Sequence, residues 1–481
     1  MPDAPDFSNL APNALHLPKQ EHLGALPPHF VWGVSTAAYQ IEGGHNADGK
    51  GPSIWDDFTA RNKRKLKGQN GNIATDFYNR YQADLDLMAS LGIQHFRLSL
   101  SWSRILPAGL GQANQKGLDF YHRVIDAALQ RGITPWLTLY HWDLPQALEA
   151  KGGWTNRDVV SWFSDFSHLA ATSFGSKIAN WMVMNEPMVF TGAGYFLGLH
   201  APGRRGFKNF LPAMHHATLS MAAGGRVLRA VLPPTAQIGT TFSASWVEAF
   251  SPSEKDVAAA RKADALLNRL YLEPTLGLGY PVADLPPLRE VERYMRPDDE
   301  ASMAFDFDFH GLQLYTREVV KHSFFTPYLH AKLVHPKARG QAHTVMNWEV
   351  YPLALRLMLH RWSGYGKMRK IFVTENGAAF QDSISASGHI DDSDRTAYLQ
   401  SHIAQMLQAK AEGVPVEGYF IWTFTDNFEW AEGYKPRFGL VHIDFETQKR
   451  TIKASGQWYA SLLSQQKAAA SQAANFAEAT T

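Results

Sequence analysis

The sequence predicts an α/β fold, a single (β/α)8 barrel in which extended loops after the strands form a pocket. Eight short apolar runs, rich in β-branched and aromatic residues, alternate with stretches long enough to be helices. No shorter repeat is present that would indicate a solenoid or a propeller. Two of the apolar runs end in a carboxylate followed by a turn, and the carboxyl ends of barrel strands are where functional residues gather.

The expected elements alternate along the chain. Residues 51–56 are expected to form a loop. Helices are expected near residues 77–91, 121–130, 162–174, 257–271, 351–365 and 395–412. The expected strands are residues 30–35, 95–102, 134–140, 181–186, 237–242, 309–315, 371–375 and 418–423.

The 481 residues are expected to form one domain, because α/β barrels with long loops reach this length as a single unit. Residues 1–24 are polar and proline-rich and predict a loosely held N-terminal arm. Residues 25–466 are assigned to the barrel. Residues 467–481 are rich in Ala, Ser and Gln and predict a flexible C-terminal tail.

The composition narrows the classes of partner. Hydrophobic residues make up 45% of the chain, enough for a large core, and the net charge is only +1. This balance gives no indication of nucleic-acid binding, and the basic stretch 61–67 is interpreted as a solvated loop.

The sequence also predicts a cytoplasmic setting. The chain has no cysteine, which excludes disulfides and thiolate metal sites and fits a reducing compartment. The N-terminus lacks the basic and apolar regions of a signal peptide, and no apolar run is long enough to span a membrane. No membrane partner is expected, and self-association into a homo-oligomer is left open.

One stretch, Ile371-Phe-Val-Thr-Glu-Asn-Gly, carries an acidic residue at the end of an apolar run. A carboxylate such as Glu375 is costly at the end of a buried strand unless something uses it. Taken alone, it could equally be a helix N-cap or a salt-bridged strand end.

A second stretch with the same pattern favours a functional role over these structural ones. Trp181-Met-Val-Met-Asn-Glu-Pro places Glu186 after an apolar run, and Pro187 should push Glu186 towards an extended conformation. Two strand-end carboxylates are what the hydrolysis of a glycosidic bond requires, one as nucleophile and one as general acid/base.

Other strand ends carry residues suited to a sugar, which presents hydroxyls at fixed spacings and an apolar C–H face. Each such residue has an ordinary structural interpretation when taken alone, but each follows its own predicted strand. The residues are Gln40, His141, Asn185, Trp422, Glu429 and Trp430.

Six motifs in order resemble those of the family 1 glycoside hydrolases, the β-glucosidase family, and the resemblance extends over residues 30–459. The motifs are Ala38-Tyr-Gln-Ile-Glu-Gly, Phe96-Arg-Leu-Ser, His141-Trp-Asp-Leu-Pro-Gln, Asn185-Glu-Pro, Thr374-Glu-Asn-Gly and Asn427-Phe-Glu-Trp.

The resemblance implies a role for each matching position. Glu375 would be the nucleophile and Glu186 the general acid/base, and Arg97 would contact the nucleophile. The residues implied in substrate binding are Gln40, His141, Trp142, Asn185, Tyr315, Trp348, Trp422, Glu429 and Trp430, of which Tyr315 would also contact the nucleophile.

The activity that this resemblance implies is that of a retaining β-glucosidase. It would release terminal non-reducing β-D-glucosyl residues from small-molecule β-glycosides and short oligosaccharides, with side activity on β-galactosides and β-fucosides. Such chemistry needs no metal and no cofactor.

Physical reasoning gives each carboxyl group an expected charge. Arg97 should lower the pKa of Glu375 and keep it ionised. Burial and a second carboxylate nearby should raise the pKa of Glu186 and keep it protonated. In a retaining pair the two carboxyl groups lie about 5–5.5 Å apart.

Departures from the family pattern bear on specificity. Family members that act on 6-phosphorylated sugars have Ser, Lys and Tyr at the positions of Glu429, Pro436 and Phe438, so this chain should prefer unphosphorylated substrates. Met188 replaces a common Trp and should widen the leaving-group subsite. Val183 stands where the family often has Thr, a difference that bears on the support beneath Glu186. Gln313 and Leu314 stand where the family commonly has Asn and Tyr, and modest retuning is expected there.

Two other classes of protein compete with this interpretation. One is a sugar-binding barrel without catalysis, which the joint presence of both Glu residues and Arg97 disfavours. The other is a metal-dependent barrel hydrolase, for which the chain offers only the adjacent pair His215-His216 in a stretch that predicts a helix.

Overall fold

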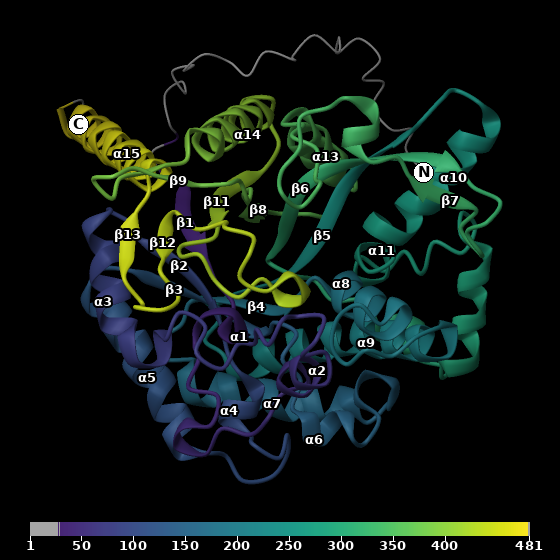
Figure 1. The fold of residues 1–481 in the computed structure, drawn as a ribbon. Helices are drawn as coiled ribbons and strands as arrows, with labels where there is room; N and C mark the ends of the chain where they lie inside the picture. Colours follow the sequence, from purple (N-terminus) through teal and green to yellow (C-terminus); the bar gives the residue numbers. More distant parts are fainter. Residues whose placement is uncertain (1–26, 28, 480–481) are drawn as a thin grey trace.

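Eight parallel strands close into a barrel, which confirms the predicted fold (Figure 1). The computed structural model describes residue 27 and residues 29–479, with side chains up to residue 468. The predicted N-terminal arm lies outside the described residues. The barrel strands are β1 (Val31–Ser35), β2 (His95–Ser99), β3 (Thr134–Tyr140), β4 (Asn180–Asn185), β5 (Gln237–Ala249), β6 (Phe309–His322), β8 (Ile371–Asn376) and β11 (Val416–Trp422).

Pairing between β5 and β6 closes the barrel, and every pairing between its eight strands is parallel. Both of these strands are longer than predicted. They continue to pair beyond the barrel, as far as Ala249 opposite Val320, and β7 (Ala331–Leu333) adds an antiparallel strand to this extension. The extension raises one wall above the carboxyl ends of the other strands.

Helices surround the barrel on its outside (Figure 1). The predicted helices are all present, with shifted ends, and one helix of 25 residues, α9, packs against α7. The longer helices are α3 (Phe77–Ser90), α5 (Gln115–Gln130), α7 (Val159–Phe174), α9 (Phe207–Val231), α10 (Glu254–Asp264), α13 (Leu353–Ser363), α14 (Ser393–Ala411) and α15 (Ala454–Ala479).

Short elements fill the loops that follow the strands. The short helices are α1 (Ala38–Ile41), α2 (Ile54–Arg61), α4 (Trp102–Ile105), α6 (Gln146–Glu149), α8 (Pro187–Thr191), α11 (Leu272–Thr275), α12 (Asp299–Ser302), η1 (Ala47–Gly49), η2 (Gly153–Thr155), η3 (Gly192–Leu197), η4 (Ala265–Arg269), η5 (Pro286–Tyr294), η6 (Pro336–Arg339) and η7 (Trp430–Glu432). Two small hairpins are β9 (Ser383–Ile384) with β10 (Ile390–Asp391), and β12 (Val441–Ile443) with β13 (Arg450–Ile452).

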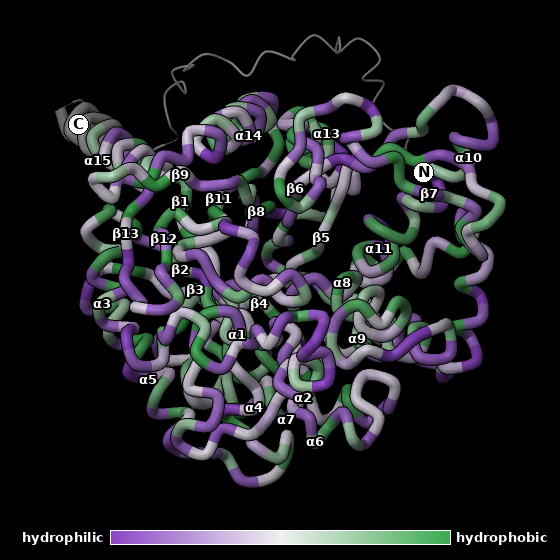
Figure 2. The backbone as a smooth tube through the Cα atoms, viewed as in Figure 1, coloured by the Kyte–Doolittle hydropathy of each residue, from purple (hydrophilic) through white to green (hydrophobic). Residues whose placement is uncertain are grey.

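A plug of large side chains fills the barrel near the amino ends of its strands. Trp136, Met182, Phe309, Phe372 and Phe420 pack against one another there and are nearly completely buried. Figure 2 shows hydrophobic residues along the strands in the middle of the molecule. Because apolar side chains close this end, the polar residues that point inward lie at the carboxyl ends of the strands.

The segment 51–56 is not wholly a loop, because α2 begins at Ile54. Ser53 caps this helix: its hydroxyl accepts from the Asp56 N–H, and the Asp56 carboxylate accepts from the Ser53 N–H at 2.7 Å. This reciprocal capping box is a sequence signal for a helix start, and the prediction of a loop overlooked it.

The backbone of the segment predicted to be a flexible tail is helical as far as the structure describes it. Helix α15 continues through the segment after residue 467 and ends at Ala479. The reason is the alanine content of this segment, since alanine has the highest helix propensity. Among the residues that the structure describes, no helix is both long enough and apolar enough to cross a membrane.

Candidate active site

The two carboxylates predicted to carry the chemistry both lie at the carboxyl ends of barrel strands. Glu375 is the fifth residue of β8, and Glu186 directly follows β4. Their residues are 3% and 7% exposed, respectively. The prediction that Glu186 is extended is wrong: its φ of 41° is left-handed, with its N–H bonded to the Thr241 carbonyl at 3.0 Å as Pro187 begins α8.

Three side chains hold the Glu375 carboxylate. Arg97, the third residue of β2, forms a buried ion pair with Oε1. The Tyr315 hydroxyl donates to Oε2 at 2.6 Å, and Gln313 Nε2 donates to Oε1 at 2.8 Å. The structure therefore brings Arg97 and Tyr315 to Glu375 as expected, and it adds Gln313.

Asn185 connects the two catalytic candidates to the rest of the site. Its Oδ1 accepts from Arg97 Nη2, from Gln313 Nε2 at 2.7 Å and from Thr241 Oγ1 at 3.0 Å. Its Nδ2 donates to His141 Nε2 at 3.0 Å, which leaves the ring proton of this neutral histidine on Nδ1. The side chain is thus fixed by strands β2, β3, β5 and β6.

Glu429 lies in a second polar group, built by Gln40 and the loop after β11. Gln40 Nε2 donates to Glu429 Oε2 at 3.2 Å, to Asn427 Oδ1 at 3.1 Å and to the Phe428 carbonyl at 3.0 Å. Gln40 is fully buried, so its amide fixes where the Glu429 carboxyl points.

Aromatic rings join the two polar groups into one site. The His141 ring lies 5.9 Å from Trp422 and 6.0 Å from Trp430, measured between centroids. Trp142 lies 4.7 Å from Trp430 and donates its indole N–H to the Asn185 carbonyl at 2.9 Å.

Trp348 lies beside Tyr315, which donates a hydrogen bond to Glu375. Its ring is 5.1 Å from Tyr315 and 6.0 Å from Phe438, and the side chain is half-buried. Every residue predicted for the site is therefore in contact with another predicted residue, except Glu186, whose carboxyl has no hydrogen bond within the described part of the chain.

Sequence reasoning undervalued Gln313 and missed Thr241. Gln313 bridges Asn185 and Glu375, yet it was interpreted only as a modest departure from the family pattern. Polar atoms of Gln40 (Oε1), His141 (Nδ1) and Gln313 (Oε1) have no partner among the described residues. Buried polar atoms without partners are available to sugar hydroxyls or to water.

Burial and charge set the protonation of the two carboxyl groups. Burial raises the pKa of Glu186 well above its ordinary value, and the negative charge of Glu375 raises it further, as predicted. Burial also raises the pKa of Glu375, because the loss of solvation outweighs the effects of Arg97 and Tyr315. The expectation that Arg97 holds this pKa below its ordinary value is therefore wrong.

Glu429 differs from the anion that the sequence suggested. Burial and the charge of Glu375 raise the pKa of Glu429 to about 8, although hydrogen bonds from Gln40 and Trp422 oppose the shift. At neutral pH the carboxyl is therefore mainly protonated, so it can donate as well as accept a hydrogen bond.

Val183 cannot retune the site directly. It is fully buried and faces α9, where its Cγ1 would lie 2.9 Å from a Cβ placed on Gly224. The neighbouring Met182 points into the barrel instead, in keeping with the alternation along a strand. Asn185 also points inward, because the pairing of β4 with β5 shifts in register between Met182 and Asn185.

His215 and His216 lie on α9 and have structural partners. His215 contacts the Tyr280 hydroxyl at 3.0 Å and Asp299 Oδ2 at 2.8 Å, and His216 contacts the Trp154 carbonyl at 2.9 Å. Within the described residues, no group of three His, Cys, Asp or Glu side chains is placed to hold a metal ion.

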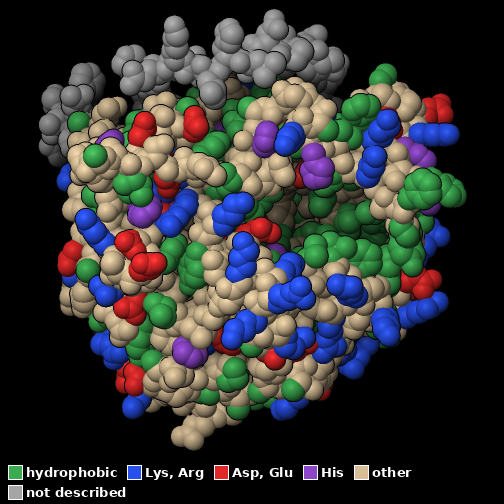
Figure 3. All heavy atoms as spheres, in the orientation of Figure 1, with side chains coloured by type: hydrophobic (Ala, Val, Ile, Leu, Met, Phe, Trp, Pro, Cys, Tyr) green, Lys and Arg blue, Asp and Glu red, His purple; other side chains and the backbone are tan. Residues whose placement is uncertain are grey.

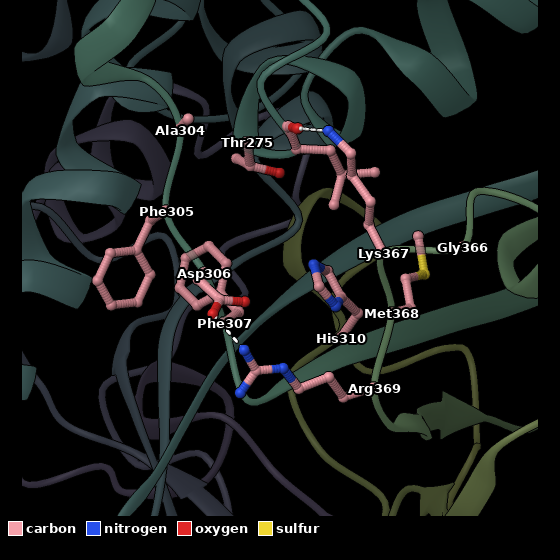
Figure 4. Close-up of a pocket in the computed structure, with 11 residues that line it drawn as sticks. Thr275, Ala304, Phe305, Asp306, Phe307, His310, Gly366, Lys367, Met368 and Arg369 are labelled. Carbon is pink, nitrogen blue, oxygen red and sulfur yellow. Dashed lines mark hydrogen bonds and ion pairs between the residues drawn. The ribbon is translucent and has the colours of Figure 1, made fainter.

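A cavity of about 560 Å³ opens at the opposite end of β6 and β8, near their amino ends (Figure 4). Its charged groups are already occupied: Arg369 pairs with Asp306, and Lys367 Nζ donates to the Leu276 carbonyl at 2.7 Å. Its His310 ring nitrogens are buried from solvent. None of the residues that line the cavity is a predicted site residue.

Comparison with known proteins identifies the class. The family model for Glycosyl hydrolase family 1 matches residues 22–468, and the chain belongs to this family. β-Glucosidase A of Thermotoga maritima is 41% identical over 91% of this chain and 97% of that protein. A β-glucosidase of Agrobacterium sp. is 37% identical over 91% of this chain and 95% of that protein.

Solved structures agree with the sequence comparison. The Thermotoga maritima β-glucosidase in complex with glucoimidazole matches with a TM-score of 0.88 at 41% identity, over 92% of this chain and 99% of that chain. The same enzyme in complex with deoxynojirimycin also gives 0.88. The protein is therefore an enzyme of glycosyl hydrolase family 1, built on a (β/α)8 barrel.

Proposed function

We propose that the protein is a retaining β-glucosidase that releases terminal β-D-glucosyl residues from β-glucosides and short oligosaccharides. The observation that carries this proposal is the asymmetry of the two buried carboxyl groups. Glu375 is held by Arg97, Gln313 and Tyr315, whereas Glu186 has no such partners and has the more strongly raised pKa. Relatives at about 40% identity that are named β-glucosidases support the substrate class.

The chemistry follows from this asymmetry. The Glu375 carboxylate attacks the anomeric carbon while the glycosidic C–O bond breaks, and Glu186 gives its proton to the departing oxygen. Glu186, now ionised, then takes a proton from water, and that water attacks the anomeric carbon and releases Glu375. Two inversions at one carbon give net retention.

We expect the two polar groups of the site to bind different hydroxyls of the sugar. Glu429 and Gln40 would bind hydroxyls at the non-reducing end, while Asn185 and His141 would bind those nearer the anomeric carbon. Trp422 would provide the platform under the ring. Galactosides and fucosides differ from glucosides only where Glu429 would bind, so we expect reduced but measurable rates on them.

Initial rates on a panel of p-nitrophenyl glycosides test this function. We expect fast release from the β-glucoside and slower release from the β-galactoside and β-fucoside. A preference for the β-mannoside would place the substrate class elsewhere. Binding of glucose by a folded protein that hydrolyses none of the panel would identify a sugar-binding barrel without catalysis.

A 6-phosphate on the glucoside should reduce kcat/KM by about 100-fold or more, because a phosphate dianion would face the buried Glu429 without a cationic partner from Pro436 or Phe438. Above pH 8, where Glu429 is mainly ionised, Glu429→Gln should narrow this gap, since it then removes a negative charge and keeps the size of the side chain. Equal kcat/KM values for the glucoside and its 6-phosphate would show that Glu429 does not discriminate against a phosphate at this position of the sugar.

The pH profile of kcat/KM for an aryl glucoside should be bell-shaped. Activity should fall as the pH drops through the raised pKa of Glu375, because the protonated carboxyl is no nucleophile. It should also fall as the pH rises through the raised pKa of Glu186, because no proton remains for the leaving group.

Variants assign the two limbs of this profile. Glu186→Gln should lose the alkaline limb and keep the acid limb, whereas Glu429→Gln should keep both. An alkaline limb that survives in Glu186→Gln and disappears in Glu429→Gln would transfer the titration to Glu429, the pKa of which is about 8.

A further inference from the structure

Exposed cations gather around the opening above the site, although the net charge of the chain is only +1. Three segments supply them, residues 61–67, 204–208 and 435–437, which we call the cationic rim. Figure 3 shows Lys and Arg side chains below a hollow in this face. The exposed cations of the rim without an ion pair in the described structure are Lys63, Arg64, Lys65, Lys67, Arg205, Lys208 and Lys435.

The remaining cations of the rim are neutralised locally. Arg61 pairs with Asp57, Arg204 with Glu149 at 2.6 Å, and Arg437 with Asp426 at 3.0 Å. The exposed Glu432 is the carboxylate next to the third segment. The seven unpaired cations therefore leave a positive excess on one edge of the opening.

The three segments are adjacent in space although they are far apart in sequence. Arg61 Nη2 donates to the Pro202 carbonyl at 3.0 Å, which joins the first segment to the second. The Tyr434 N–H donates to Gln69 Oε1 at 3.0 Å, and its hydroxyl donates to the Asn70 carbonyl at 2.7 Å. These bonds join the first segment to the third.

The cationic rim lies close to the sugar site. Burial, and to a smaller extent the charge of Lys65, lowers the pKa of His200 to about 4. The His200 ring lies 5.8 Å from the Trp142 ring between centroids. Trp142 in turn lies 4.7 Å from Trp430. His200 therefore connects the rim to Trp142, one of the residues proposed to bind the sugar.

The apolar edge of the opening adjoins the second segment of the rim, where Phe207 lies in the chain between Arg205 and Lys208. Phe207 packs on Phe196 at 5.2 Å and on Tyr328 at 4.3 Å between ring centroids. Figure 3 shows hydrophobic side chains beside the hollow. The segments that carry Phe196 and Tyr328 expose further large apolar side chains. They are Leu197, Leu199, Phe324 and Phe325, which are 50%, 48%, 77% and 91% exposed.

From this juxtaposition we propose that the opening selects β-glucosides whose leaving group is an aromatic acid. The aromatic ring would lie on the apolar edge, and its carboxylate would face the cationic rim. A cleft edged by charges of one sign concentrates ligands of the opposite sign, and salt screens this effect over about 10 Å at 0.1 M. The inference rests on the proposed β-glucosidase activity and names its substrate class.

Two matched substrates test the inference on the whole enzyme: 4-(carboxymethyl)phenyl β-glucoside and its methyl ester. The methylene group insulates the phenol from the carboxylate, so the two leaving groups have similar reactivity. At about 0.02 M ionic strength the acid should have a kcat/KM about tenfold higher than the ester, and the ratio should approach unity at about 0.5 M. A ratio of one or less at low salt would overturn the inference.

Charge reversals locate the effect. Lys65→Glu and Arg205→Glu should each lower kcat/KM for the acid several-fold at low salt and change that for the ester less than about twofold. The matched control is Lys370→Glu, an exposed lysine before β8 that contacts Gln237 at the amino end of β5. Equal effects of all three reversals would refute a role for the rim.

The outcomes also separate the two proposals. An enzyme that hydrolyses the ester but shows no salt-dependent preference for the acid keeps its β-glucosidase function and loses the inferred substrate class. An enzyme that hydrolyses neither substrate contradicts the proposed function itself.

Discussion

Replacing Glu375 with Ala should lower kcat on p-nitrophenyl β-glucoside by about 10⁴-fold or more, because no other group can form the covalent bond to the anomeric carbon. Arg97, Gln313 and Tyr315 would remain in place but would have no carboxylate to hold. Initial rates at saturating substrate measure the loss.

Two controls accompany this variant. Glu375→Gln preserves the size of the side chain and should be equally inactive, which separates chemistry from folding. Glu417→Ala changes a glutamate at the amino end of β11, where it lies 3.4 Å from Lys410, and should keep the wild-type rate. A Glu375→Ala enzyme within tenfold of the wild type would move the nucleophile to another residue.

Replacing Glu186 with Ala should produce a loss that depends on the leaving group. Cellobiose, which leaves as a poorly acidic alcohol, needs a full proton and should lose about 10²–10⁴-fold in kcat/KM. A 2,4-dinitrophenyl glucoside leaves without protonation and should lose much less in its first step. Equal losses on both substrates would contradict the assignment of Glu186 as the acid.

Azide distinguishes the two positions by stereochemistry. In Glu186→Ala, azide should enter the space left by the carboxyl group and attack the glycosyl-enzyme, giving β-glucosyl azide. In Glu375→Ala, it should take the place of the nucleophile on the other face and give the α-azide. Proton NMR of the product identifies the anomer, and the reverse pattern would exchange the roles of the two residues.

The strands and their catalytic ends could be predicted because each combines two strong local signals. β8 and β4 are apolar runs that stop at a carboxylate, and a turn residue follows each of them. The extensions of β5 and β6 gave no such signal, since beyond the barrel they are held by pairing with each other and with β7. The long-range partner, rather than local propensity, decides where those strands end.

The role of Gln313 could not be derived from its neighbours in sequence. Its amide bridges Asn185 and Glu375 only because β4, β6 and β8 bring the three residues to one layer of the barrel. The raised pKa of Glu375 is similar: the sequence identifies the neighbouring Arg97, but it does not reveal how completely the site removes both groups from water.

The cationic rim, like the role of Gln313, could not be predicted from neighbouring residues in the sequence. Residues 61–67 are a basic stretch that sequence reasoning interpreted as a solvated loop. Only the folded chain places them beside residues 204–208 and 435–437, through bonds such as that from Arg61 to the Pro202 carbonyl. Residues 61–67 are mostly exposed to solvent, as predicted, but in the folded chain they also form part of the charged edge of the opening.

The most direct test of the account is to trap the covalent intermediate. With 2,4-dinitrophenyl 2-deoxy-2-fluoro-β-glucoside, the fluorine slows both steps while the good leaving group speeds the first, so the glycosyl-enzyme should accumulate. Mass spectrometry of the digested protein should then find one fluoroglucosyl group, on Glu375. A label on Glu186 or Glu429, or product release without any covalent adduct, would contradict the double displacement at Glu375.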